Sequence, residues 1–278
     1  MELHAYAALA LGHVERQALY ADRVDWPAVR AALSAAADRG TTTADLHDEL
    51  RAVLRDACGP HGGLSTPTGR PPADRQLPSA RQAGDVGVLV LPACPGDVGS
   101  VRGYTVAGGR ALRRLSPAAR WSVDLRGNGG GSMWPMLAVA APLLRGDGVL
   151  GAFVDRDGLR TPWWLRRRRV GTGHWASARS RGPLRLPGPV AVLTDARTAS
   201  AAEAVATAFR GLPDVRSYGA PTAGLSSSNV TVRLPDGALL HITSARLADR
   251  SGAVHEGPLR PDVPAEDALA AALADLHG

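Results

Sequence analysis

The chain has 278 residues, of which 45% are hydrophobic and 21% are charged. This composition is that of a globular protein and excludes a disordered or collagen-like chain. No run of about 18 apolar residues occurs, which argues against a membrane-spanning helix. The two cysteines, Cys58 and Cys94, are too few for a disulfide framework and lack the spacing of a metal site. Glu2 and His4 stand where a signal peptide carries basic residues, so we expect a cytoplasmic protein.

The net charge is +6, and all 32 basic residues are arginine. The densest group is Arg166 to Arg169 in "WWLRRRRV", on the second arm of a predicted hairpin whose turn is Asp157-Gly158. Because alternate side chains of a strand point to opposite faces, the four arginines need not form one patch. A solvated strand is favoured over an anion or nucleic-acid site, since no nucleic-acid-binding motif accompanies them. We therefore expect neither a nucleic-acid nor a membrane partner.

The N-terminal part of the chain has the pattern of packed helices. Apolar residues recur at helical spacing from about residue 5 to 57, with Asp25 and Thr43 as predicted N-caps. The segment that follows is rich in Gly, Pro, Ser and Arg and has no periodicity, which predicts a loop. The sequence thus predicts a helical domain over residues 1–62 and a loop or linker over 63–84.

In the remaining part, residues 85–278, strands alternate with helices. Strands are predicted over 85–93, 120–127, 188–196, 215–219, 229–237 and 238–252, in addition to the arginine-rich hairpin. Helices are predicted over 106–117, over 133–146, from Ala201 onward, and over 264–278. This alternation predicts an α/β core with a largely parallel sheet.

A glycine cluster, "VDLRGNGGGS" over residues 123–132, joins one predicted strand to the next helix. Glycines allow a tight turn there and leave backbone N–H groups free to face an anion. The cluster is neither a P-loop nor a dinucleotide-binding fingerprint, because the residues that define those motifs are absent. On its own it is equally well explained as a structural turn.

Ser200 stands at another strand-to-helix junction, in "RTASAAEAVA". The N–H of Ala201 belongs to the first turn of the following helix, where N–H groups lack helical acceptors, so a hydroxyl and a free donor lie together. Ser200 also has a simpler explanation as an N-cap, with Glu203 completing a capping box. The two roles are compatible.

Five separated motifs, "VDLRGNGGG", "RTASAAEAVA", "GAPTAG", "LPDGALLHIT" and "GPLRPDVP", occur in the order found in the C-terminal processing (tail-specific) serine peptidases. The chain most resembles the nisin-resistance and tricorn-core branch of that family, over nearly its whole length. The resemblance implies a crotonase-like ββα-spiral core preceded by a helical bundle. Many relatives carry a PDZ domain where residues 63–84 stand, and about 20 residues are too few for such a domain.

The resemblance implies that Ser200 is the nucleophile. Leu225 occupies the position of the lysine that activates the serine in the processing peptidases, and the chain contains no lysine. The serine/histidine branch remains, and its histidine matches His61 in "GPHGGL"; an imidazole is a suitable base near neutral pH. His241 and His255 are possible substitutes for His61.

The resemblance also assigns the oxyanion hole. It implies the N–H of Ala201 and a second donor from the glycine cluster. Gly130 is preferred over Gly129 for that donor, because some relatives have proline at the latter position and proline cannot donate.

The surroundings of the histidine depart from the family pattern. His61 is flanked by Pro60 and Gly62, so the serine that assists the histidine in the tricorn type is missing. Glu256 is a possible group that orients the imidazole. Asn229 and His174 are possible residues of a substrate groove.

The expected reaction is cleavage of a peptide through an acyl-enzyme, without metal or cofactor. One alternative is a non-catalytic binding module for a peptide or small ligand, since the retinoid-binding proteins share the fold. Another is an acyl-transfer hydrolase that acts on a small ester or amide. The sequence indicates no oligomeric state.

Overall fold

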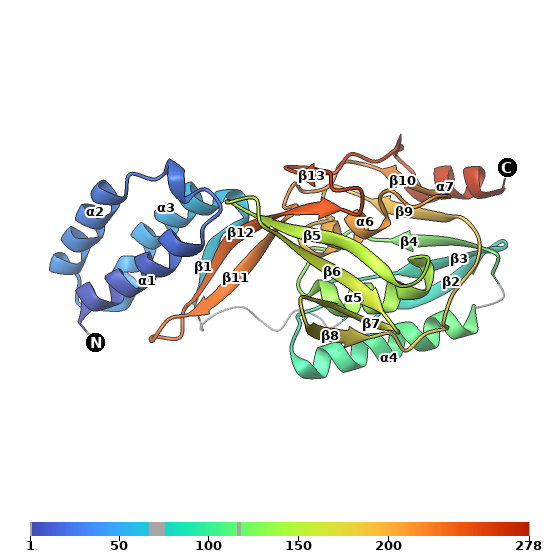
Figure 1. Cartoon of the computed structure of the whole chain (residues 1–278), viewed down its shortest axis with the longest axis horizontal. Coiled ribbons are helices and arrows are strands. Elements are labelled where there is room, and N and C mark those ends of the chain that lie inside the picture. The colour runs from blue at the N-terminus through green and yellow to red at the C-terminus, as the bar shows by residue number, and fades with distance from the viewer. Residues whose placement is uncertain (1, 67–75, 116–117, 278) are drawn as a thin grey trace. The chain divides into compact units, whose positions relative to one another are not determined.

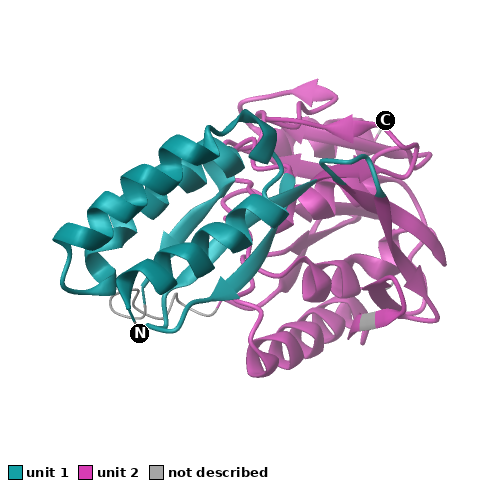
Figure 2. Cartoon of the chain, turned by 60° about the vertical axis from the view of Figure 1, so that its left-hand side comes forward, with its two compact units in different colours: residues 1–71, 155–159, 227–245 teal, residues 72–154, 160–226, 246–278 magenta. Residues whose placement is uncertain are grey.

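The computed structural model describes residues 2–66, 76–115 and 118–277 (Figure 1). The chain forms two compact units (Figure 2). Unit 1 comprises Met1–Pro71, Asp155–Leu159 and Ser227–Ala245, and unit 2 comprises Pro72–Val154, Arg160–Ser226 and Arg246–Gly278. Unit 1 therefore includes a hairpin from the C-terminal half, which the sequence had placed with the α/β core.

Unit 1 consists of helices packed on short strands. Its helices are α1 (Leu3–Gln17), α2 (Trp26–Arg39) and α3 (His47–Cys58), with 3-10 turns at Ala21–Arg23, Thr43–Leu46 and Gly59–His61. Its strands are β1 (Gly63–Ser65), β11 (Ser227–Arg233) and the first part of β12 (Leu239–Asp249). Both β1 and β11 pair with β12. Buried apolar side chains of all three helices pack with Leu240 and Ile242 of β12, which explains why this hairpin belongs to unit 1.

One of the two predicted caps in unit 1 is confirmed. The Asp25 carboxylate accepts the N–H of Ala28 at 3.1 Å. Thr43 was the wrong choice for the second cap. Thr42 is the cap, one residue earlier, and Asp45 completes a capping box with it.

The central element of unit 2 is a six-stranded sheet in the order β14-β10-β9-β4-β3-β2. In chain order the strands are β2 (Ser79–Ala83), β3 (Val86–Val90), β4 (Arg120–Asp124), β9 (Val190–Thr194), β10 (Val215–Gly219) and β14 (Val263–Pro264). All adjacent pairs are parallel except β2 with β3, which confirms the largely parallel sheet. β2 was not predicted, because "SARQA" has little strand propensity and forms a strand through its pairing with β3.

Helices pack on both faces of this sheet. They are α4 (Val98–Arg114), α5 (Met133–Ala140) with a 3-10 turn at Ala141–Leu143, α6 (Ala201–Phe209) and α7 (Ala268–His277). Val190 and Val192 of β9 share a core cluster with residues of α4, α5 and α6, whereas Ala191 and Leu193 share one with α7. The period-two alternation of β9 thus places the two helix layers on opposite faces.

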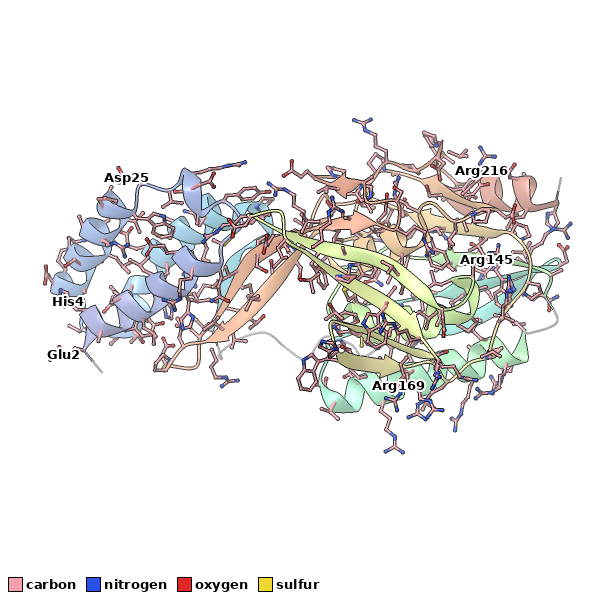
Figure 3. The ribbon with its side chains drawn as sticks, in the orientation of Figure 1. Glu2, His4, Asp25, Arg145, Arg169 and Arg216 are labelled. Atoms are coloured by element: carbon pink, nitrogen blue, oxygen red, sulfur yellow. The ribbon has the colours of Figure 1, made fainter. Side chains whose placement is uncertain are left out.

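A second, antiparallel set of strands also belongs to unit 2. It comprises β5 (Gly148–Asp155), β6 (Arg160–Arg166), β7 (Arg169–Thr172), β8 (Trp175–Arg179) and the two-residue β13 (Val254–His255), which pairs with the end of β12. The predicted hairpin forms, with Asp157-Gly158 in the turn. The sequence placed the four consecutive arginines on one strand, which is wrong: Arg166 ends β6, Arg167 and Arg168 form a turn with positive φ, and Arg169 begins β7. The Arg169 side chain extends from the surface (Figure 3), and Arg166 is also exposed. Among the described residues, no helix is long and apolar enough to cross a membrane.

Candidate active site

Ser200 lies in a sharp turn directly before α6. Its φ is +54° and its ψ is −114°, a conformation that costs a non-glycine residue about 1–3 kcal/mol. Such strain persists only where surrounding contacts fix the backbone. The turn places the partly exposed Ser200 beside the first N–H groups of α6. In the described chain, the N–H of Ala201 makes no hydrogen bond.

Glu203 supplies the contacts that fix this turn. Its side chain is completely buried, and Oε2 accepts the N–H of Ser200 at 2.7 Å. Oε1 accepts the hydroxyl of Thr222 at 2.6 Å and the N–H of Gly224 at 3.1 Å. Burial raises the pKa of Glu203 above its usual value, although these hydrogen bonds oppose the shift. The predicted capping box forms, and it also fastens the nucleophile position to the segment at 222–224.

The glycine loop is held from its first residues by two carboxylates. Asp124 makes a bidentate pair with the Arg126 guanidinium, at 2.9 and 2.7 Å, and accepts the Arg126 N–H at 3.1 Å. The Gly127 N–H donates to Asp195 Oδ1 at 3.0 Å. Hydrogen bonds to Gly127 and Arg197 lower the pKa of Asp195 in spite of its partial burial. These residues fix where the loop begins, ahead of the three consecutive glycines Gly129 to Gly131.

Asn128 joins the glycine loop to the serine turn, a role that the sequence analysis missed. It is buried, and its Nδ2 donates to the carbonyl of Leu91 at 2.7 Å. Its backbone carbonyl accepts the N–H of Ala199 at 2.9 Å. Its Oδ1 accepts the N–H of Gly130 at 2.9 Å. The residue before Ser200 and the loop opposite it are thus tied together through one side chain and its backbone.

Gly130 packs directly against the serine turn. Its φ is +99°, and a Cβ added there would lie 2.8 Å from Ser200 Cβ and 3.2 Å from Ala201 N. Only glycine fits this position. A Cβ at Gly129 would meet nothing within 4 Å, so that residue faces open space. Gly130 thus lies against the serine turn, and its N–H, the candidate second donor, donates to Asn128 Oδ1.

His61 lies in unit 1, at the end of the 3-10 turn that follows α3. Its Nδ1 is 2.7 Å from Ser227 Oγ, and its carbonyl accepts from Asn229 Nδ2 at 2.8 Å. Burial, together with the nearby His241, lowers the pKa of His61 to about 4. Ser227 is a second residue that sequence reasoning missed; the "SSSN" stretch marks it only as one of three serines.

The other candidate residues have partners of their own. His241 lies 3.0 Å from Ser65 Oγ, and His255 lies 2.9 Å from the buried Asp249 carboxylate. Glu256 pairs with Arg246, whereas Ser227 occupies the orienting position at His61 Nδ1. His174 is exposed in the two-residue turn between β7 and β8. The described residues contain no group of three His, Cys, Asp or Glu side chains that could hold a metal ion.

Comparison with known protein families identifies the part of the chain that carries the glycine loop and Ser200. Residues 105–265, which carry both the glycine loop and Ser200, match the model of peptidase family S41. The chain belongs to peptidase family S41. Membership of this family supports a serine peptidase.

One protein and two solved structures illustrate the likeness. The nisin-resistance protein of Lactococcus lactis subsp. lactis is 28% identical over 272 residues, which cover 96% of this chain and 85% of that protein. The structure of a lipoprotein from Streptococcus agalactiae matches with a TM-score of 0.86 and 25% identity, covering 100% of this chain and 96% of that one. The photosystem II D1 C-terminal processing protease matches with a TM-score of 0.65 and 16% identity, covering 96% and 94%. The mixed α/β fold is therefore that of S41 peptidases.

Proposed function

We propose that the protein is a serine peptidase in which Ser200 attacks a peptide carbonyl and His61 is the base. The observation that carries this proposal is the strained Ser200 turn, held by a buried glutamate and packed against a glycine loop. A plain N-cap needs neither the positive φ nor the close glycine. A nucleophile that must be held rigidly beside N–H donors requires both the positive φ and the close glycine.

The proposed first step is proton transfer from Ser200 Oγ to His61 Nε2 as the Oγ–carbonyl bond forms. An Nδ1–H that donates to Ser227 leaves the Nε2 lone pair free to accept that proton. The tetrahedral oxyanion would receive hydrogen bonds from the N–H of Ala201 and from that of Gly130, which would have to leave Asn128 Oδ1. Collapse of the intermediate would expel the amine, protonated by His61. Water then hydrolyses the acyl-enzyme by the same route.

This reaction requires His61 of unit 1 to meet Ser200 of unit 2. The two sets of contacts involve residues that are close in sequence. Glu203 holds the N–H of Gly224, and only Leu225 and Ser226 separate Gly224 from Ser227, the partner of His61. A neutral imidazole is the form that accepts a proton, and a pKa of about 4 keeps His61 neutral at neutral pH while making it a weaker base than an imidazole at its usual pKa.

The serine/histidine type is proposed over the serine/lysine type because Leu225 stands at the lysine position and the sequence has no lysine. The ββα-spiral arrangement of the core is likewise part of the proposal, supported by the alternation of parallel strands and helices in unit 2. We propose a peptide substrate, since one similar fold is a C-terminal processing protease and the 28% identical relative is named for nisin resistance. The cytoplasmic location of the protein stays a prediction.

A fluorophosphonate probe tests the proposal, because it forms an adduct only with an activated serine. Intact-mass analysis of wild type is expected to show one adduct, which Ser200→Ala abolishes and His61→Ala reduces by about 10²-fold or more. Ser228→Ala is the matched control and keeps the adduct. A folded wild type without an adduct would favour the non-catalytic binding module. An adduct without cleavage of any peptide, but with turnover of small esters or amides, would favour the second alternative.

A further inference from the structure

Three adjacent strands of unit 2 carry a row of arginines. Arg166 of β6 lies opposite Arg169 of β7, which lies opposite Arg179 of β8. The neighbouring row packs on the core and consists of Leu165, Val170 and Ala178. Because successive side chains of a strand alternate between faces, the arginine row points away from the core, and Figure 3 shows Arg169 extending outward. Like charges directly opposite each other destabilise a sheet, so the fold itself does not explain this row.

The turn that joins β6 to β7 adds two more arginines. Arg167 and Arg168 have φ values of +45° and +68°, a conformation that favours Asn-Gly and is costly for arginine. The Arg168 guanidinium donates to the carbonyl of Gly182 at 2.6 Å, which holds the turn on a later segment. Asp147 accepts only the backbone N–H of Arg167, at 2.9 Å. The Arg167 side chain is exposed and has no partner in the described part of the chain, so packing does not explain an arginine there.

The segment after β8 continues this surface. Arg181 and Arg185 are exposed, and Leu184 between them is 77% exposed. The end of α4 borders the segment, because Arg113 Nη1 donates to the Arg181 carbonyl. We call the exposed side chains of this surface the arginine face: Arg166, Arg167, Arg169, Arg179, Arg181, Leu184 and Arg185.

Carboxylates are missing from the sequence that builds the arginine face. No Asp or Glu occurs between Asp157 and Asp195, nor in the stretch between Asp97 and Asp124 that contains α4. Among the described residues, no arginine of the face makes an ion pair; Arg166 lies over the Trp164 ring, 5.0 Å from its centre. The face therefore presents guanidinium groups that the fold leaves without counter-charges.

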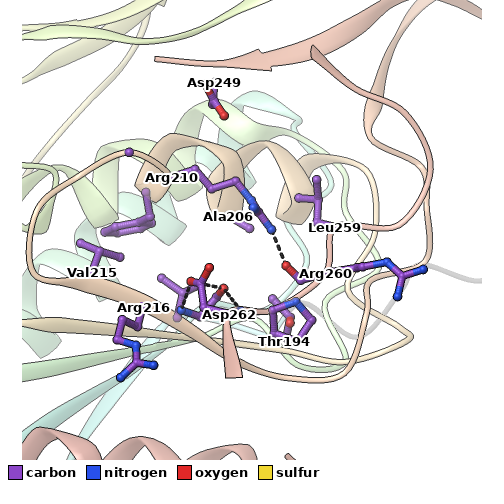
Figure 4. Close-up of a pocket in the computed structure, with 14 residues that line it drawn as sticks. Thr194, Ala206, Arg210, Val215, Arg216, Asp249, Leu259, Arg260 and Asp262 are labelled. Atoms are coloured by element: carbon purple, nitrogen blue, oxygen red, sulfur yellow. Dashed lines mark hydrogen bonds between the residues drawn. The ribbon is translucent and has the colours of Figure 1, made fainter. Parts of the chain in front are cut away.

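Arginines on other parts of unit 2 have partners within the chain. Arg216 pairs with Asp275 at 2.9 Å. At the cavity between α6 and strands β9 and β10, Arg210 donates to the carbonyl of Arg260 at 2.6 Å (Figure 4). The lack of partners on the arginine face is thus a property of that surface and not of every arginine in the unit.

We propose that the arginine face binds the surface of a membrane that contains anionic phospholipids. Its guanidinium groups pair with lipid phosphates through charge-assisted hydrogen bonds, and Leu184 enters the boundary between headgroups and acyl chains. Such binding is peripheral and needs no spanning helix. This proposal replaces the sequence-based expectation of no membrane partner, which assumed that the four consecutive arginines lie on one strand.

Two features favour a lipid surface over other anions. The face extends over three strands and a further segment, so it is wider than a single phosphate group. An exposed leucine between two arginines suits the apolar layer below lipid headgroups. A nucleic acid is less well matched, because the stretches between Asp157 and Asp195 and between Asp97 and Asp124 contain no Asn or Gln to read bases.

Co-sedimentation of the full chain with vesicles tests the proposal. Vesicles of phosphatidylcholine with about one-third phosphatidylglycerol are compared with vesicles of phosphatidylcholine alone. We expect the chain to bind only the anionic vesicles, and about 0.5 M salt to release most of it, because salt screens the charges. A chain that binds neither vesicle, or both equally, overturns the proposal.

Three variants locate the surface. A variant with Arg166→Gln, Arg169→Gln and Arg179→Gln is expected to bind anionic vesicles about 10²-fold more weakly. The matched control carries Arg39→Gln, Arg55→Gln and Arg233→Gln, three exposed arginines of unit 1, and is expected to stay within about threefold of wild type. Leu184→Ser is expected to weaken vesicle binding about threefold or more. It carries the test if the first variant does not fold, because Leu184 is exposed.

Three results would contradict the proposal. Equal losses in the two triple variants would show attraction by net charge alone. Tighter binding of duplex DNA than of anionic vesicles would identify a nucleic-acid surface, and unchanged vesicle binding in Leu184→Ser would show that no apolar side chain enters the membrane. Labelling of Ser200 by the fluorophosphonate is expected to be the same in all three variants, so this test is independent of the proposed catalysis.

Discussion

The carboxylate of Glu203 accepts the N–H of Ser200 at 2.7 Å, and this contact holds the strained serine in place. The same carboxylate accepts from Thr222 and Gly224, so it has three donors and no exposed surface. Removing it leaves the buried Thr222 hydroxyl and two partly buried N–H groups without an acceptor, and a fully buried donor left so costs about 1–3 kcal/mol.

The first prediction concerns this glutamate. In Glu203→Gln one carboxylate oxygen becomes an NH₂ group, which cannot accept from a donor. We expect fluorophosphonate labelling of Ser200 to slow about tenfold or more and the free energy of unfolding to fall by about 1–3 kcal/mol. Labelling kinetics and urea denaturation measure the two effects. Glu266→Gln on the exposed surface is the control and changes neither; unchanged labelling in Glu203→Gln would show that the turn does not depend on this bond.

The second prediction separates the two candidate oxyanion donors. Gly129→Pro removes the N–H of residue 129 but not that of Gly130, so labelling is expected to stay within about threefold of wild type. Gly130→Ala forces a Cβ to 2.8 Å from Ser200 Cβ at a φ of +99° and is expected to abolish labelling. A fall of 10²–10³ in Gly129→Pro, with the fold intact by circular dichroism, would transfer the donor role to Gly129.

The local parts of the site could be predicted from the sequence. The capping box from Ser200 to Glu203 and the Asp157-Gly158 turn depend on residues a few positions apart, and both formed as expected. The helix predicted over 106–117 is correct in type but begins at Val98, because the glycines in "GSVRG" weaken the helical pattern there.

The long-range parts could not be predicted. Ser227 meets His61 across 166 residues of sequence, and no local pattern selects it from three adjacent serines. Asn128 reaches Ala199 through its backbone carbonyl, which carries no sequence signal at all. Such pairs are set by how the units fold, so a motif can name the nucleophile and the base but not the groups that position them.

The third prediction tests Ser227 as a positioning residue. Ser227→Ala removes the partner of His61 Nδ1, which frees the imidazole to rotate and to adopt the other tautomer. We expect labelling of Ser200 to slow about 10- to 100-fold, with partial rescue in Ser227→Thr, which keeps a hydroxyl. Ser228→Ala is the control, because the side chain of Ser228 points to the face of β11 opposite to that of Ser227. If Ser227 had only a structural role, Ser227→Ala would lower the free energy of unfolding, and Ser227→Thr would not restore the labelling rate.

The last prediction is a pH profile. With a His61 pKa of about 4, the neutral imidazole predominates down to about pH 5. Labelling of Ser200 is therefore expected to stay nearly constant from pH 8 to about 5.5. A histidine at its usual pKa of about 6.5 would lose about half its rate at pH 6.5 and about nine-tenths at pH 5.5. His241→Asn removes a repelling neighbour, so the pKa of His61 rises and the pH at which labelling falls moves upward.

The stability of the fold depends on the same proton. The unfolded chain binds the His61 proton more tightly than the folded chain, so the free energy of unfolding falls as the pH drops from about 6.5 through 4. Labelling for fixed times across the pH range measures the rate profile, and denaturation at each pH measures the free energy of unfolding. A midpoint of the rate profile near pH 6.5 in wild type would show that His61 is not buried as the structure has it.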